Sequence, residues 1–191
     1  MKSFPLAKLP LLLAAVLAAP LVWGCAAGEP LPAPEWGAGG VYRLDSGDQL
    51  RIIVFGQEEL TGSYAVDGAG MISVPLLPPV GVRGLTTAQL EKKISDELEK
   101  GVVISPSVSV QVETFRPFFI LGEVRRPGRY PYVHGMSVLT AVAIAGGFTP
   151  RAEQDRMSIT RSVGDSAREA RVERHTRVEP GDVIFVHERF F

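Results

Sequence analysis

The sequence predicts an α+β protein made of two small β-rich modules behind an N-terminal targeting segment. Short runs of apolar residues with the period of a β-strand recur along the chain, and two segments, residues 85–101 and 137–147, have the pattern of helices. The 191 residues, less the targeting segment, suffice for one compact domain or two small ones. We expect two modules, residues 41–114 and 115–191, with no transmembrane helix in the mature chain.

The N-terminus has the composition of a secretory signal peptide. Lys2 and Lys8 precede an apolar run, residues 9–22, that two prolines interrupt. The run is too short and too interrupted for a comfortable membrane span. We therefore predict that residues 1–24 are a signal peptide and that the protein leaves the cytoplasm.

The only cysteine, Cys25, directly follows this segment. Residues 22–25, Val-Trp-Gly-Cys, resemble a bacterial lipobox, in which the cysteine is acylated, although Trp23 stands where that motif has a small residue. A lone thiol in an oxidising compartment has no disulfide partner. We predict lipid attachment at Cys25, followed by an extended Pro/Gly-rich tether, residues 25–40. By the sorting rule of enteric bacteria, Ala26 in place of Asp implies delivery to the outer membrane.

The first module is predicted to have the order β-β-α-β. After a turn at Gly47-Asp48, residues 50–55 alternate with the period of a strand that is buried mainly on one face. A short strand is expected over residues 71–74. In the last strand one set of alternate residues points to the core, Val108, Val110 and Val112, and the other set points away, Ser107, Ser109 and Gln111.

The clearest helix of the chain occupies residues 85–101. Thr86 and Gln89 form a capping box, and Gly101 is placed for the C-terminal cap. We expect a surface ion pair between Asp96 and Lys100. Three apolar residues recur every fourth position as a stripe that belongs to the core and not to a cofactor site: Leu90, Ile94 and Leu98.

The second module repeats this organisation in shorter form. We expect a strand over residues 118–121, a turn at Pro127-Gly128 and a returning strand over residues 129–133. Ser137 caps a helix that ends at Gly146-Gly147, and its small residues allow close approach to a sheet: Ala141, Ala143 and Ala145. A strand with Met157 and Ile159, a charged edge strand over residues 168–177 and a final strand over residues 183–186 complete the module.

The two modules also resemble each other. Gly47-Asp48 precedes an apolar strand in the first module, and Gly181-Asp182 precedes one in the second. The entries to the two helices are similar as well. We therefore expect two related β-grasp-like units.

The sequence offers no catalytic constellation, so we expect no enzyme, no metal site and no cofactor. Three histidines lie in separate segments without ligand-like spacing, His134, His175 and His187. There is no Gly-x-Ser-x-Gly elbow and no Walker loop. Residues 25–112 contain 6 basic and 11 acidic residues, and residues 113–191 contain 12 and 10. Neither half has the basic face with interleaved aromatics that nucleic-acid binding requires.

Together these segments resemble the bacterial polysaccharide export proteins, which are outer-membrane lipoproteins of capsule and exopolysaccharide secretion systems. The resemblance to their export domain rests on Tyr42-Arg43-Leu44, Gly47-Asp48, the strand to Phe55, Asp67-Gly68 and the helix from Leu85 to Leu98. The resemblance to their soluble-ligand-binding β-grasp (SLBB) domain rests on Gly122-Glu123-Val124, Pro127-Gly128, Ala145-Gly146-Gly147-Phe148 and Pro180-Gly181-Asp182-Val183. It extends over nearly the whole mature chain.

The resemblance implies a homo-oligomeric ring with a wide passage through which a polysaccharide leaves the periplasm. An inner-membrane polysaccharide co-polymerase is the implied partner, and acyl chains anchor the periplasm-facing protein in the outer membrane. We expect six residues to lie on exposed or subunit-facing surfaces and to contact a neighbouring subunit or the polysaccharide: Ser107, Ser109, Gln111, Arg125, Arg126 and Arg129.

Longer members of the family carry a further β-grasp domain and a C-terminal amphipathic helix that builds the membrane pore. Because the sequence ends at Phe191, we expect a short form that needs another protein for the pore. The main alternative is a saccharide-binding or scaffolding lipoprotein of the secretion complex that forms no conduit itself. A structural spacer of the cell envelope is a third reading.

Overall fold

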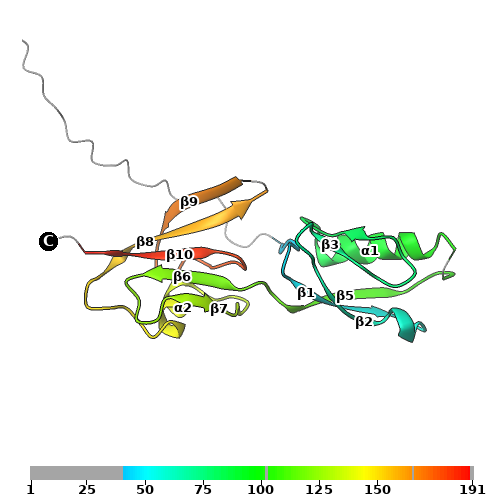
Figure 1. Cartoon of the computed structure of the whole chain (residues 1–191), viewed down its shortest axis with the longest axis horizontal. Helices are drawn as coiled ribbons and strands as arrows, with labels where there is room; N and C mark the ends of the chain where they lie inside the picture. The colour runs from blue at the N-terminus through cyan, green and yellow to red at the C-terminus, as the bar shows by residue number, and fades with distance from the viewer. Residues whose placement is uncertain (1–40, 102, 165, 190–191) are drawn as a thin grey trace, which may run out of the picture.

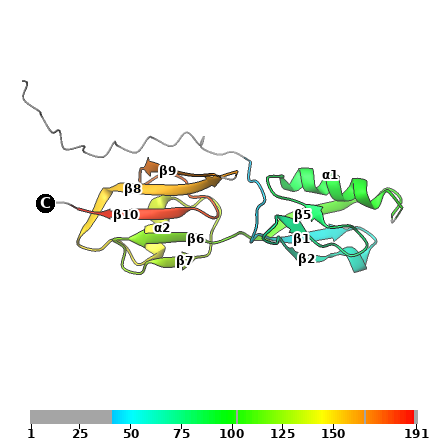
Figure 2. The same ribbon diagram turned by 45° about the horizontal axis from the view of Figure 1, so that its top comes forward.

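The structure is a computed structural model, and it describes residues 41–101, 103–164 and 166–189. The predicted signal peptide, Cys25 and the tether lie outside the described residues. The described chain forms two modules side by side along its longest axis (Figure 1), and a second view shows the same separation (Figure 2). Each module has its own hydrophobic core, which confirms the predicted fold class.

The first module is an antiparallel sheet of three strands in the order β2-β1-β5, with a helix on one face. Its strands are β1 (Gln49–Val54), β2 (Gly62–Ala65) and β5 (Val108–Thr114). A two-stranded sheet, β3 (Met71–Ile72) and β4 (Val80–Gly81), and a short helix, η1 (Glu58–Leu60), complete it. Alternate residues of β1 are buried, as its sequence period predicts. The strand expected over residues 71–74 ends at Ile72, three residues before the first proline of a proline-rich corner.

Helix α1 (Thr87–Leu98) has the predicted capping box. The backbone N–H of Gln89 donates to Oγ1 of Thr86 at 3.2 Å, and the backbone N–H of Thr86 donates to Oε1 of Gln89 at 2.9 Å. The predicted stripe is fully buried, with 0% exposure for each of Leu90, Ile94 and Leu98. Burial of such side chains contributes about 1.5–3 kcal/mol each, so this stripe fixes the helix on its sheet.

The predicted ion pair between Asp96 and Lys100 is wrong. Asp96 pairs with Lys92 at 3.1 Å, one turn earlier, and Lys100 pairs with Glu97 at 2.8 Å. The helix ends at Leu98 with Glu99 as its C-cap, so Lys100 lies beyond the regular turn that the prediction assumed. Both observed pairs are exposed and contribute little to stability.

The second module is a mixed sheet of five strands in the order β7-β6-β10-β8-β9. Its strands are β6 (Phe118–Gly122), β7 (Gly128–Tyr130), β8 (Ala152–Val163), β9 (Ser166–Val172) and β10 (Val183–Glu188). The first and last strands, β6 and β10, are parallel neighbours inside the sheet. Helix α2 (Val138–Ile144) packs on one face. This is a β-grasp-like arrangement, as predicted for this module.

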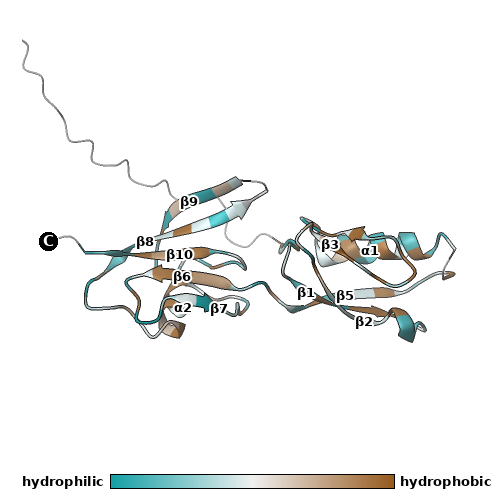
Figure 3. Cartoon of the chain, viewed as in Figure 1, coloured by the Kyte–Doolittle hydropathy of each residue, from teal (hydrophilic) through white to brown (hydrophobic). Residues whose placement is uncertain are grey.

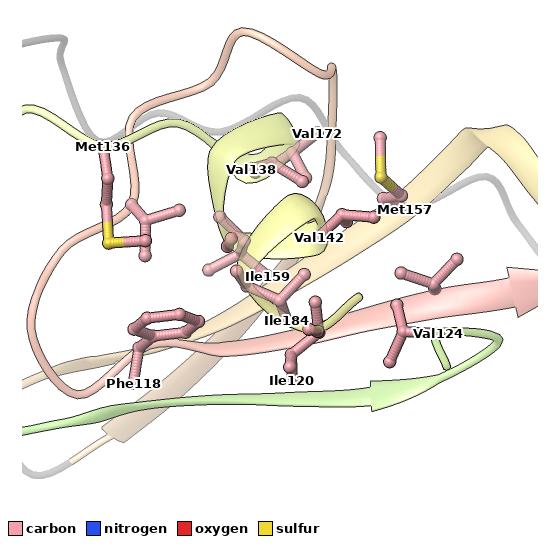
Figure 4. Close-up of a cluster of buried hydrophobic side chains, with 14 of the residues drawn as sticks. Phe118, Ile120, Val124, Met136, Val138, Val142, Met157, Ile159, Val172 and Ile184 are labelled. Atoms are coloured by element: carbon pink, nitrogen blue, oxygen red, sulfur yellow. The ribbon is translucent and has the colours of Figure 1, made fainter. Parts of the chain in front are cut away.

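The core of the second module lies between α2 and the sheet. Figure 4 shows the helix with Val138 and Val142 above Ile120, Ile159 and Ile184 of three neighbouring strands, and all five residues belong to one hydrophobic cluster. All five side chains are 0–1% exposed. Alternation along β6 and β10 places every second side chain in this core and leaves the others on the opposite face.

Two details of the second module, and the expected similarity between the two modules, differ from the sequence-based predictions. The returning strand ends at Tyr130 and not at residue 133. Ala141 and Ala145 are buried, but Ala143 is exposed because it lies on the outer side of the short helix. The first module is not β-grasp-like in its topology, since its β1 and β5 pair antiparallel where β6 and β10 pair parallel. No helix in the described ranges is long and apolar enough to cross a membrane.

Candidate functional site

The two modules meet around Arg116, which lies in the three-residue connection between β5 and β6. Its backbone N–H donates to Oδ1 of Asp48 at 2.9 Å, and its Nη1 lies 3.4 Å from Oδ2 of the same carboxylate. Asp48 is fully buried, whereas the Arg116 side chain is 22% exposed. A buried carboxylate is stable only when its charge and lone pairs are compensated. The connection between the modules is therefore fixed to the first module by a buried ion pair.

Tyr42 completes this first set of contacts. Its hydroxyl donates to Oδ2 of Asp48 at 2.6 Å and accepts from Nη1 of Arg116 at 2.8 Å. Burial, and next the hydrogen bond to Asp48, raise the pKa of Tyr42. Phe115 links the modules through its ring, whose centroid lies 5.0 Å from that of Tyr42 and 5.4 Å from that of Tyr132. Aromatic contacts of this edge-to-face kind stabilise the junction beyond simple burial.

A second buried carboxylate, Asp182, lies at the start of β10. Nε and Nη2 of Arg161 donate to its two oxygens at 2.8 and 2.7 Å, in a bidentate pair. Nη1 of Arg161 also lies 2.8 Å from Oε1 of Glu179. Asp182 is 0% exposed and Arg161 is 7% exposed, so this pair is shielded from water.

The two carboxylates sit in matching turns, Asp45-Ser46-Gly47-Asp48 and Glu179-Pro180-Gly181-Asp182. In each turn the last carboxylate accepts from the backbone N–H three residues earlier, at 2.9 Å and 2.7 Å. Gly47 and Gly181 have φ of +90° and +87°, values that glycine adopts more readily than residues with a side chain. A Cβ on Gly181 would lie 2.7 Å from Nε of Arg116. Arg116 therefore packs against both turns.

Between the turns is a polar cavity of about 240 Å³. Its walls combine guanidinium donors with carboxylate acceptors, and they consist of Asp45, Arg116, Arg161, Ser162, Glu179, Pro180 and Gly181. Mixed donors and acceptors suit hydroxyl-rich ligands better than apolar ones. The arrangement lacks a nucleophile paired with a base among its lining residues, so its chemistry is hydrogen bonding and charge pairing.

A second polar cluster, on the uncovered face of the second sheet, contains His187. Oγ of Ser158 donates to Oε1 of Glu169 at 2.6 Å and lies 3.3 Å from Nε2 of His187. The carboxylate contacts the serine and not the histidine, and Ser158 is 1% exposed, so the three groups do not form a catalytic triad. Burial, and then the charge of Arg156, lower the pKa of His187. Within the described ranges, no three His, Cys, Asp or Glu residues are grouped as a metal site.

The predicted polar ladder lies on the uncovered face of the first sheet, beside β1. Ser107 and Gln111 are exposed and Ser109 is half-buried. In the antiparallel register Ser109 is opposite Ile53 and Gln111 is opposite Arg51. The ladder therefore shares its surface with side chains of β1.

The predicted arginines lie in the other module, and the structure does not bring them together with the ladder. Arg125 and Arg126 are exposed in the turn after β6, where Nη2 of Arg126 donates to the carbonyl oxygen of Ile144 at the end of α2, at 3.2 Å. This contact compensates the negative end of the helix. Arg129 is exposed on β7, opposite Phe119 in the register.

Sequence reasoning missed the two buried ion pairs and the tyrosine beside the first of them, a set that consists of Tyr42, Asp48, Arg116, Arg161 and Asp182. The signal that could have found two of them was the repeated acid-x-Gly-Asp pattern at residues 45–48 and 179–182. We interpreted Gly47-Asp48 as a turn and Gly181-Asp182 as a similar pair before an apolar strand, but an aspartate that directly precedes an apolar strand is also a candidate for burial.

Comparison with known proteins assigns both modules. Residues 37–113 match the family described as polysaccharide biosynthesis/export protein, and residues 117–171 match the SLBB domain. The boundary between the two matches falls at residues 114–116, where Arg116 joins the modules.

Two curated relatives carry functional names. The exopolysaccharide production protein ExoF of Rhizobium meliloti (strain 1021) is 33% identical in an alignment of 118 residues that covers 56% of this chain and 28% of that protein. The polysialic acid transport protein KpsD of Escherichia coli is 29% identical in an alignment of 111 residues that covers 57% of this chain and 20% of that protein. The chain thus spans less than a third of the length of either relative. Together these matches support the polysaccharide export protein family for this chain, with an export domain followed by an SLBB domain.

Proposed function

We propose that the chain is a ring-forming outer-membrane lipoprotein that exports capsular polysaccharide or exopolysaccharide from the periplasm across the outer membrane. The observation that carries this proposal is the order of parts in one chain, a lipobox-like segment ending at Cys25, a tether, an export domain and an SLBB domain. The relatives' names concern exopolysaccharide production and polysialic acid transport, which supports a polysaccharide as the cargo.

The junction of the modules supports assembly into a closed ring. A ring of fixed size requires each subunit to present its two contact surfaces at a constant angle. The three-residue connection is held by both modules, because the backbone N–H of Arg116 donates to Asp48 of the first module and the backbone N–H of Gly181 in the second donates to the carbonyl oxygen of Pro117 at 3.1 Å, which restricts movement of one module against the other. Export of a hydrated polymer needs such packing and a polar passage, and it needs no acid–base chemistry. The proposed partners are an inner-membrane polysaccharide co-polymerase and the outer membrane, through the acyl chains on Cys25.

Gene deletion with complementation tests the export function. We expect loss of surface polysaccharide on deletion, recovery with the native gene, and failure of recovery with Cys25→Ser, because the unacylated protein leaves the outer-membrane fraction. Palmitate labelling of the native protein and of C25S checks the lipid directly. Surface polysaccharide that is unchanged by the deletion would contradict the export function.

The arginine turn after β6 gives a test of assembly. Reversing two charges with Arg125→Glu and Arg126→Glu is expected to weaken ring assembly or export, since both side chains are exposed and Arg126 also contacts the end of α2. Native mass spectrometry of the lipidated protein measures the oligomer. Arg168→Glu on the edge strand β9 is a control for charge alone. Normal secretion and oligomer size in the double variant would refute a role for this turn.

One observation favours the alternative, a saccharide-binding or scaffolding lipoprotein that forms no conduit. The polar cavity beside Arg116 and Glu179 has the donors and acceptors that bind sugar hydroxyls. Isothermal titration calorimetry with oligosaccharides, repeated on Ser162→Phe to fill the cavity, tests this role. A stable monomer whose sugar affinity disappears in S162F supports the binding protein, whereas a closed ring in electron micrographs supports the conduit.

A further inference from the structure

Each module leaves one face of its sheet without a helix, and both faces carry exposed apolar side chains. On the first sheet these are Ile53 and Phe55, which are 41% and 82% exposed. Both follow the outward phase of β1, in which alternate residues are buried. We name these two residues, with the exposed acidic residues that closely follow them in the chain, Glu58 and Glu59, the β1 patch.

The second sheet carries a larger surface of this kind. Phe119, Leu121 and Phe185 are 39%, 44% and 41% exposed. The parallel register places Leu121 beside Phe185 and Phe119 beside Val183, so these side chains are contiguous across two strands. In Figure 3, β6 and β10 are mainly hydrophobic along their length. We name Phe119, Leu121, Val183 and Phe185, with the flanking Arg129 and Arg171, the β6–β10 patch.

The charges around the two patches are complementary. The β1 patch contains two exposed glutamates, and one arginine, Arg51, lies two residues before Ile53 on the same face of β1. Arg129 lies opposite Phe119 across the β6–β7 pair, and Arg171 is two strands from Phe185, with Ser158 between them. Glu169 is likewise two strands from Val183, with Thr160 between them, so two arginines and one glutamate leave this rim with a net charge of +1. Whole modules follow the same trend. Residues 41–114 contain 6 Lys/Arg and 10 Asp/Glu, a net charge of −4, and residues 115–191 contain 12 Arg and 9 Asp/Glu, a net charge of +3.

The composition of the patches favours a protein partner. Contiguous exposed apolar surface marks an interaction site, and aromatic residues with arginine are enriched in the cores of protein interfaces. A sugar platform needs flat, accessible aromatic faces. Here the ring of Phe185 is already in an edge contact with His187, with centroids 4.8 Å apart, and its neighbours Leu121 and Val183 have no ring.

We propose that the β1 patch of one copy docks on the β6–β10 patch of the next copy. The inference rests on the self-assembly proposed above and specifies its contact surfaces. Because the two patches differ and lie on the same chain, the contact is head-to-tail. Repetition of such a contact produces a closed ring when the rotation closes. Opposite charges at the rims select this pairing over contact between two like patches.

A mixing experiment tests this arrangement with the full lipidated chain in detergent. Phe55→Asp disables the β1 patch and Phe185→Asp disables the β6–β10 patch. Each variant alone is expected to bind other copies at least about 10-fold more weakly than the native chain, as for loss of an aromatic anchor. An equimolar mixture is expected to give dimers and nothing larger, because one intact patch of each kind remains. Native mass spectrometry or analytical ultracentrifugation measures these species.

Two further variants separate surface effects from folding. Leu139→Asp changes an exposed residue of α2 with similar exposure, 40%, and is expected to keep the native oligomer. Leu121→Glu alters the same patch as F185D from a neighbouring strand and should reproduce its result. Circular dichroism identifies any variant that has lost its fold. If either F185D or L121E is unfolded, the role of the β6–β10 patch is decided from the oligomer of the other variant.

The outcomes distinguish this inference from the proposed function. The head-to-tail pairing is wrong if F55D and F185D both keep the native ring. It is also wrong if the native chain forms a ring while the mixture of the two variants remains monomeric. In both cases the proposed ring itself stands. If these variants keep the ring but lose affinity for an oligosaccharide, the patches bind sugar and not a neighbouring copy. A native chain that is monomeric at every concentration overturns both the inference and the ring.

Discussion

Removing the buried carboxylate of Asp48 should destabilise the protein more than any exposed charge. Asp48→Ala takes the acceptor from four donor atoms, which are the Tyr42 hydroxyl at 2.6 Å, the backbone N–H groups of Asp45 and Arg116 at 2.9 Å each, and Nη1 of Arg116 at 3.4 Å. Breaking one side of a buried ion pair costs about 3–5 kcal/mol. Because the Arg116 side chain remains 22% exposed and water reaches it, we expect a loss near the lower value, about 3 kcal/mol.

Thermal unfolding measures this loss. For a chain of this size each kcal/mol lowers Tm by about 2–4 °C, so D48A should unfold about 6–12 °C below the native protein. A double-mutant cycle with Arg116→Ala should return a coupling energy above about 1 kcal/mol, since the Arg116 side chain reaches the Asp48 carboxylate both directly and through the Tyr42 hydroxyl. Asp96→Ala, which removes an exposed pair with Lys92, is the control and should cost less than about 1 kcal/mol. A Tm for D48A within about 2 °C of the native value would refute the reasoning.

Three more predictions concern the cores and pH. Ile94→Ala should lower the free energy of unfolding by about 2–5 kcal/mol in urea titration, because the side chain is 0% exposed, and a smaller loss would argue that the core is loosely packed. Gly122→Ala should cost at least about 1–3 kcal/mol, because Gly122 has φ +82° and an added Cβ would meet a backbone oxygen of β10, whereas Gly68→Ala, with open space around it, should be neutral. Burial and the charge of Arg156 lower the pKa of His187, so the imidazole binds a proton more tightly in the unfolded chain than in the folded protein. The free energy of unfolding is therefore unaffected by this group above its unfolded pKa of about 6.5, and it decreases as pH falls below that value. The native protein should therefore lose more stability between pH of about 7.5 and 5 than His187→Gln, and equal losses would contradict the assignment.

The sequence predicted those parts of the fold whose signals are local. The capping box of Thr86, the four-residue spacing of the α1 stripe and the alternation in β1 each involve residues within one element, and all three are present. The same approach failed at the end of α1. Spacing alone placed Asp96 and Lys100 on one face, but the helix stops at Leu98, so the physical neighbour of Lys100 is Glu97.

The junction could not be predicted in this way, because its partners are far apart in sequence. Arg116 is 68 residues from Asp48 and 74 from Tyr42. No periodicity relates such positions, and a single arginine near a strand looks the same whether it is solvated or pairs with a buried acid. The exposed patches were missed for a related reason. Phe119 and Phe185 appear as ordinary strand residues until the register places their strands side by side.

The position of β10 in the sheet has a consequence for how the second module folds. This strand lies between β6 and β8, yet it follows both in sequence and comes after the turn that holds Asp182. The hairpin of β6 and β7 can form early, but the two halves of the sheet join only when residues 183–188 arrive. Pairing over such sequence distances slows folding. A chain that has not yet delivered β10 has two unpaired strand edges, and it is in this interval that the module is most exposed to aggregation and proteolysis.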